Sequence, residues 1–230
     1  MFRRLATLAL SLSLATTAFT TSTASARDFA RPPAAAPAAP AAPPEAPRAV
    51  DEPATPRLSA TTRARLLRVL AARRARNVGA FRAYADRGRY PHNFITAGPL
   101  NVWIDQEGRM CAAATMIFHG GGKALVRRVA REDNHIKLGD VTGGPVLDWI
   151  LTSGLTQAEV ALIQEPFMGR EIREPHEPGS PAWRVAEDER LRDRYDVILG
   201  ELALHQAANL EAAVDALAAR PDLVARLLRG

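Results

Sequence analysis

The sequence predicts a mainly α fold, which is α+β only through one small β-hairpin. Three observations lead to this fold class. Apolar residues recur at helical spacing in most segments, the segments are bounded by capping residues, glycine or proline, and a single short stretch has the composition of paired strands. The chain has 230 residues, 47% of them hydrophobic, which is enough to bury one core. We therefore expect a single mainly helical domain over residues 58–230.

The domain is expected to begin with one long helix over residues 60–86. Ser59 supplies an N-terminal cap, and Gly88 followed by Pro91 ends the helical run. A break near Asn77 is an alternative that the pattern leaves open. The apolar side chains that recur at helical spacing in this segment are Leu66, Leu70, Phe81 and Tyr84.

The hairpin is expected next along the chain. Residues 101–104 have the composition of a strand, residues 105–108 form a turn, and residues 109–111 return. Two helices are then expected over residues 112–119 and 123–132. Three consecutive glycines separate them and end the first one.

The second half of the domain is expected to consist of helices joined by turns and one loop rich in proline and glycine. A capping box of Thr156 with Glu159 starts a short helix that ends at Pro166. Ser180 followed by Pro181 starts the last long helix. The other helices are expected over residues 146–153, 209–220 and 221–229. The long helix carries a packing stripe of Leu191, Tyr195, Ile198 and Leu202, continued by a semi-buried His205.

Residues 1–26 have the pattern of a signal peptide. Two arginines precede an apolar stretch over residues 5–19, and Ala24-Ser25-Ala26 fits a signal-peptidase site. The stretch is too short, and too rich in serine and threonine, to span a bilayer, and no other segment has transmembrane length. We expect cleavage near Ala26, export to the periplasm or the extracellular space, and no transmembrane segment in the mature protein.

Residues 27–57 are expected to be a disordered linker. Alanine and proline alternate through most of this segment, and proline at that density prevents both helix and sheet pairing. The linker would hold the domain away from a surface or a partner.

Arginine is concentrated at the start of the domain. Residues 58–89 hold nine arginines and one acid, Asp86, whereas residues 90–230 sum to a net charge of −5. Either these arginines pair with the acidic C-terminal helices, or they make peripheral contact with an anionic surface. The candidates for that contact are Arg63, Arg65, Arg68, Arg73, Arg74 and Arg76.

Residues 154–161 resemble the first helix of a DNA-binding motif, but no recognition helix follows, so we expect no DNA partner.

Cys111 is a candidate catalytic nucleophile because it stands where the hairpin passes into a helix. The free N–H groups and the dipole of a helix N-terminus stabilise a thiolate. Such a nucleophile requires a base, and the preferred choice is His135 oriented by Asp140, with His92 in reserve. The alternative is a small buried cysteine without chemistry. The five histidines match no metal-ligand spacing, so we expect no metal site and no cofactor.

Four motifs follow one another between about residues 90 and 167. They are D-x-x-G-x-x-C-A at residues 105–112, an Asp-Asn pair at 133–134, a helix with Trp149, and S-G-L-T-x-x-E-x-x-x-I-Q at 153–164. This order resembles a family of uncharacterised exported bacterial proteins, over about a third of the chain. The resemblance assigns no activity, because no function is established for that family.

The leading interpretation is an exported, soluble, non-catalytic binding or structural module, since the sequence contains no complete catalytic site. Its partner would be an unidentified protein or a component of the cell envelope. The alternatives are a cysteine-dependent hydrolase or transferase using Cys111, and a binder of anionic surfaces through the arginine-rich helix over residues 60–86.

Overall fold

The structure, a computed structural model, describes residues 58–169 and 179–229. By its internal contacts the chain divides into Met1–Ala49 and Val50–Gly230, and every described residue belongs to the second unit. The signal peptide and the linker predicted for residues 1–57 lie outside the described residues.

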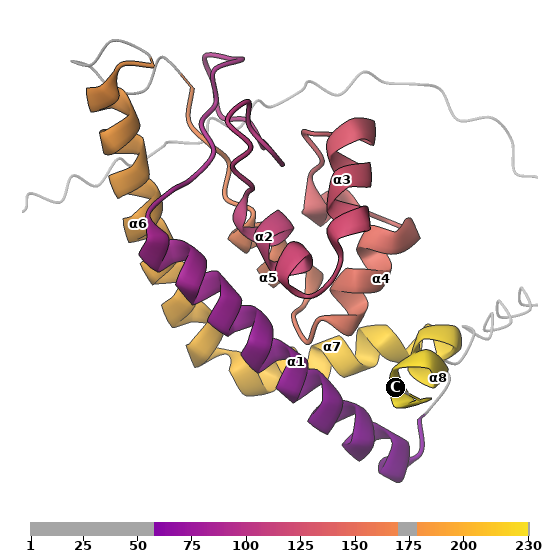
Figure 1. Cartoon of the computed structure of the whole chain (residues 1–230). Helices are drawn as coiled ribbons and strands as arrows, with labels where there is room; N and C mark the ends of the chain where they lie inside the picture. The colour runs from indigo at the N-terminus through magenta and orange to yellow at the C-terminus, as the bar shows by residue number, and fades with distance from the viewer. Residues whose placement is uncertain (1–57, 170–178, 230) are drawn as a thin grey trace, which may run out of the picture. The chain divides into compact units, whose positions relative to one another are not determined.

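The described part of the chain is mainly helical, as the sequence predicts (Figure 1). Its α-helices are α1 (Ala60–Arg87), α2 (Ala112–His119), α3 (Lys123–Glu132), α4 (Gly144–Thr152), α5 (Gln157–Ile163), α6 (Pro181–Leu204), α7 (Gln206–Ala218) and α8 (Pro221–Arg229). A short 3-10 turn, η1 (Leu138–Asp140), precedes α4. Every helix predicted from the sequence within these ranges is present, and its ends differ from the prediction by three residues or fewer.

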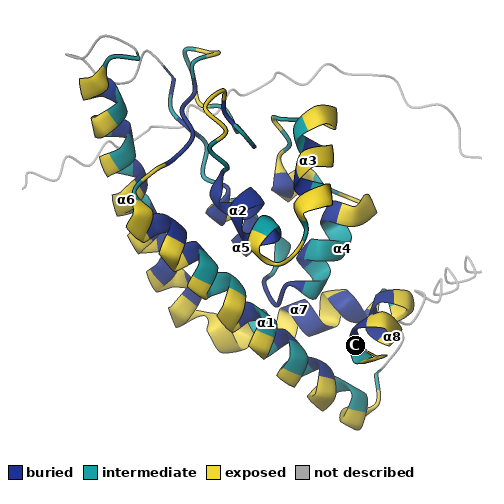
Figure 2. Cartoon of the chain, in the orientation of Figure 1, coloured by how far each residue is buried: buried dark blue, intermediate teal, exposed yellow. Residues whose placement is uncertain are grey.

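The first helix, α1, is the common packing partner of α2, α6, α7 and α8. Its N-terminal half buries Leu66 and Leu70 against α7 and α8, and its C-terminal half buries Phe81 and Tyr84 in the main cluster with α2 and α6. Figure 2 shows the buried side of α1 facing these neighbours, and α2 buried along most of its length. The helix is not broken at Asn77, because the Asn77 amide donates outward to the Ser153 carbonyl at 2.8 Å and leaves the helix backbone intact.

The packing stripe predicted for α6 is confirmed, since all four of its side chains are buried. The prediction that His205 continues this stripe is wrong. His205 is exposed because α6 ends at Leu204 and α7 begins at Gln206, so that His205 lies at the corner between the two helices.

The two-stranded hairpin is not shown: the described ranges contain no β-strand, only isolated bridges, one of them between Ile104 and Met110. The two arms share two backbone hydrogen bonds, from the N–H of Asp105 to the Arg109 carbonyl at 2.9 Å and from the N–H of Cys111 to the Trp103 carbonyl at 3.0 Å. Two other N–H groups of the first arm bond to Asn134: that of Trp103 donates to its carbonyl at 2.8 Å and that of Ile104 to its side chain at 3.0 Å. The returning arm is short because Cys111 is already the N-cap of α2.

A buried ion pair joins α1 to α5. The Arg74 guanidinium donates to both carboxylate oxygens of Glu159, at 2.7 and 2.9 Å, and both side chains are almost fully buried. The same guanidinium donates to the Leu202 carbonyl of α6 at 2.8 Å, and Asn209 of α7 donates to Glu159 at 2.8 Å. The capping box predicted for α5 is confirmed, since the N–H of Thr156 donates to the Glu159 carboxylate. The ion pair thus holds four helices together.

Gly154 forms the turn between α4 and α5 and lies directly against α1. Its φ of 81° is in the left-handed region that favours glycine. A Cβ atom at this position would lie 2.2 Å from the Leu70 carbonyl oxygen and 2.7 Å from the Arg74 amide nitrogen.

No single described helix is long and apolar enough to span a membrane; α4 and α5 meet that criterion only as a pair, bent by 103°.

Candidate functional site

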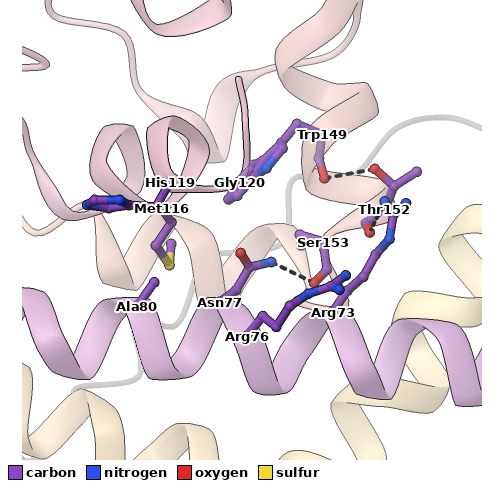
Figure 3. Close-up of a pocket in the computed structure, with 10 residues that line it drawn as sticks. All are labelled: Arg73, Arg76, Asn77, Ala80, Met116, His119, Gly120, Trp149, Thr152 and Ser153. Carbon is purple, nitrogen blue, oxygen red and sulfur yellow. Dashed lines mark hydrogen bonds between the residues drawn. The ribbon is translucent and has the colours of Figure 1, made fainter. Parts of the chain in front are cut away.

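A pocket of about 460 Å³ lies where α1, α2 and the C-terminal end of α4 meet (Figure 3). Three cationic or titratable side chains, one tryptophan and one methionine are among the residues that line it. The full lining is Arg73, Arg76, Asn77, Ala80, Met116, His119, Gly120, Trp149, Thr152 and Ser153.

One wall of the pocket is a single face of α1. Arg73, Arg76, Asn77 and Ala80 follow each other at intervals of three, one and three residues, so their side chains project from the same side of the helix. Arg74 projects from another side of the helix, and its guanidinium group is occupied by the buried ion pair with Glu159. The sequence pattern therefore divides neighbouring arginines between the core and the pocket.

Two hydrogen bonds fix this wall against α4. Arg73 donates to the Thr152 carbonyl at 3.1 Å, and Asn77 donates to the Ser153 carbonyl at 2.8 Å (Figure 3). The last carbonyls of a helix have no partner within the helix, and cationic side chains near them are favourable. This contact occupies one of the five N–H donors of Arg73 and leaves the others for a ligand.

The pocket carries positive charge that no carboxylate lining it neutralises. Arg76 forms no hydrogen bond or ion pair within the part of the chain that the structure describes. The pKa of Arg73 is lowered, first by burial and then by the positive charge of Arg76. Arg63 of the same helix, by contrast, pairs with Glu211 and Asp215 of α7. Two neighbouring guanidinium groups without a counterion define a site for an anion.

The opposite wall is largely apolar. Trp149 of α4 is half-buried, and Met116 of α2 is buried beneath the pocket. His119 lies exposed at the end of α2, with its ring edge-on to Phe118. In Figure 3 the Trp149 side chain points toward Gly120, above the arginines of α1, and His119 lies at the far end of the pocket. A ligand held here would contact both charge and an aromatic surface.

The structure does not bring together the three residues predicted as a catalytic set. His135 and Asp140 line a second, shallower pocket, and Cys111 is not among its lining residues. The His135 ring is oriented by the Asn101 carbonyl, which accepts from Nδ1 at 2.7 Å, and not by Asp140. His92, the reserve base, is buried between Arg109 and Asp188.

Cys111 is 1% exposed and serves as the N-cap of α2. Burial raises the pKa of its thiol to about 12, although the N–H groups of Ala114 and Ala113 lower it in part. The sequence placed it correctly at the start of a helix. The helix terminus is enclosed by the core, however, and desolvation outweighs the dipole there.

We expect the Cys111 thiol to react with a thiol reagent only when the protein unfolds. At pH 9 the native protein should label on the order of several hundredfold more slowly than the protein in denaturant, because a pKa near 12 leaves about one thiolate in a thousand molecules. The measurement is the rate at which a thiol reagent that releases a coloured product reacts with the protein, with and without urea. Native labelling as fast as that of the unfolded chain would contradict a buried thiol.

Four of the six arginines proposed for an anionic surface bond within the fold. Arg63 pairs with α7, Arg65 donates to the Leu228 carbonyl, and Arg73 and Arg74 bond as described above. Arg68 and Arg76 are exposed and have no bonded partner among the described residues.

Sequence reasoning missed Trp149, Asn77 and His119 as site residues. The only signal for Trp149 was its place in the order of motifs between residues 90 and 167, and nothing local distinguishes His119 or Asn77. Within residues 58–169 and 179–229, no group of three or more His, Cys, Asp or Glu side chains is arranged to hold a metal ion.

Comparison of the chain with protein-family models, with curated proteins and with solved structures gives no match.

Proposed function

We propose that the chain is an exported, non-catalytic binding module whose site is the pocket between α1, α2 and α4. The observation that carries this proposal is the pair of neighbouring guanidinium groups, Arg73 and Arg76, that face the pocket with no carboxylate beside them. Positive charge without a carboxylate beside it in a concave site attracts an anion. Export rests on the signal-peptide pattern of residues 1–26.

The hydroxyl groups of the pocket support binding over catalysis. The Ser153 hydroxyl donates to the Ile150 carbonyl at 2.7 Å and accepts from the Leu155 N–H at 3.0 Å, so it serves the turn after α4. The Thr152 hydroxyl donates to the Asp148 carbonyl at 2.8 Å. Neither hydroxyl has a base beside it, as an activated nucleophile requires. The same reasoning disfavours a cysteine enzyme, because Cys111 is enclosed in the core.

Contact of α1 with an extended anionic surface is less well supported. Arg63 and Arg74 are already neutralised by carboxylates, and Arg65 is bonded to the end of α8. A concave site with two available guanidinium groups suits a small anion better than a flat surface does.

The proposal predicts that Arg76→Gln weakens anion binding at least about tenfold, since a charge-assisted hydrogen bond contributes roughly 1.5–3 kcal/mol. Acetate, inorganic phosphate and benzoate are titrated into the purified protein by calorimetry at constant ionic strength. Arg68→Gln is the matched control, because Arg68 is exposed on the same helix, without a bonded partner in the described chain and outside the pocket lining. The control should bind like the unchanged protein.

Both variants remove an exposed side chain, so both should keep the unchanged thermal midpoint. Equal weakening in the two variants would mean that net charge, and not the pocket, attracts anions. Absence of binding by all three anions at about 10 mM, in a folded protein, would reject the pocket as a site for small anions.

A further inference from the structure

We propose that the ligand of this pocket is a small aromatic anion, with its carboxylate or phosphate group on Arg73 and Arg76 and its ring on Trp149. This inference rests on the proposed function and adds the chemical class of the ligand. It follows from which hydrogen-bond donors are unoccupied and from where the apolar wall lies.

The anionic group belongs beside α1. Arg73 and Arg76 are three residues apart, which places their Cα atoms about 4.5 Å apart along the helix axis. The guanidinium group presents its N–H donors as a planar fork that matches carboxylate or phosphate oxygens. Arg76 has all of its donors available in the described structure, and Arg73 keeps those not used on Thr152. Two such forks can hold one anionic group from two sides.

The rest of the ligand belongs against the opposite wall. The Trp149 side chain is half-buried, and its indole N–H has no hydrogen-bond partner among the residues that the structure describes. Met116 lies buried beneath the pocket, and Ala80 of α1 adds a small apolar surface. Aromatic rings stack favourably on tryptophan. A bare inorganic anion would use only the arginines and would leave this wall in contact with water.

The polar groups of the pocket also disfavour other ligand classes. Arg73, Arg76, Trp149 and His119 offer N–H donors, whereas the hydroxyl of Thr152 and the carbonyl ends of α4 are already bonded. A cationic ligand would meet like charge with no carboxylate to receive it. A neutral aromatic ligand would leave the guanidinium groups desolvated and unpaired.

The test compares ligands with and without a ring. Benzoate, phenyl phosphate, acetate, inorganic phosphate and benzyl alcohol are titrated into the purified protein at constant ionic strength. We expect benzoate to bind about tenfold more tightly than acetate, and phenyl phosphate about tenfold more tightly than inorganic phosphate, which is the upper range for an aromatic pair. Benzyl alcohol should not bind. The stronger of the two aromatic anions identifies the preferred anionic group.

Trp149→Leu is the deciding variant, because leucine keeps an apolar side chain and removes the aromatic surface. It should lose the aromatic preference while acetate and inorganic phosphate bind as before. Tighter binding of aromatic anions that survives in Trp149→Leu, or equal binding with and without a ring, would overturn this inference. In the second case the proposed function still stands, provided that Arg76→Gln abolishes binding. If none of the anions binds, the proposed function fails and this inference fails with it.

Discussion

Replacement of Gly154 by alanine is expected to destabilise the domain by about 2–5 kcal/mol. A residue other than glycine in the left-handed region costs roughly 1–2 kcal/mol, and Gly154 has a φ of 81°. The added Cβ would also lie 2.2 Å from the Leu70 carbonyl oxygen, which belongs to the backbone of α1 and cannot rotate away. Overpacking of this kind costs about 1–3 kcal/mol. Urea unfolding followed by circular dichroism measures the change.

Gly108→Ala provides the matched control for this experiment. Gly108 has a φ of 76°, similar to that of Gly154, but no atom lies within 4 Å of a Cβ built there. This control should show only the backbone cost of about 1–2 kcal/mol. Equal destabilisation by the two substitutions would show that the close approach of the turn to α1 contributes nothing.

Replacement of Arg74 by methionine is expected to cost about 3–5 kcal/mol, because it leaves the Glu159 carboxylate buried without its counterion. Methionine keeps much of the apolar length of the arginine side chain. The loss of stability therefore measures mainly the effect of the missing charge. Arg63→Met is the control: Arg63 pairs with Glu211 and Asp215 where all three side chains are at least one-third exposed, and such pairs contribute at most about 1 kcal/mol. Adding Glu159→Gln to Arg74→Met should recover part of the loss.

The stability lost in Arg74→Met should depend on pH in a definite direction. Burial raises the pKa of Glu159, but the hydrogen bonds from Arg74 and the Thr156 N–H outweigh it, so the net shift is downward. A depressed carboxyl pKa contributes stability that is present above the unfolded value of about 4.5 and is lost as the pH falls through the folded value. In Arg74→Met the carboxylate has lost its main partner and is relieved by protonation. The stability difference between the unchanged protein and Arg74→Met should therefore shrink as the pH falls toward about 4.5 and below it. A difference that stays constant down to pH 3 would contradict the buried charge.

Most of the helices could be predicted from the sequence because their ends are fixed locally. The Ser59 hydroxyl accepts from the Thr62 N–H, and the Ser180 hydroxyl accepts from the Trp183 N–H, each three residues away. Signals of this range are visible in a short window of sequence. The order of the helices and their buried faces follow from the same windows.

The backbone of the predicted hairpin depends on distant residues. Asn134 lies 30 positions beyond Ile104 and supplies both a donor and an acceptor to its backbone. No local pattern indicates that an asparagine after α3 will take the place of a paired strand. The Gln164 side chain acts in the same way on Ile136 and Leu138. Asn134 and Gln164 therefore hold loops in place.

The pocket could not be predicted because its charge depends on which arginines remain unpaired. Arg74 and Arg76 are equivalent in the sequence, yet only Arg74 meets a carboxylate, at a position 85 residues away. Periodicity separates their directions but does not reveal which direction contains Glu159. Trp149 reaches the pocket only because the turn at Gly154 brings the end of α4 against α1.

The packing of α1 against α7 and α8 also sets the order in which the molecule can fold. Leu66 and Leu70 are buried by side chains of the last two helices, and Arg65 bonds to Leu228 across 163 positions. A chain made from its N-terminus must therefore be almost complete before the first half of α1 has anything to pack against. Closing so long a loop is slow, so we expect the contacts of this half of α1 to form late in folding.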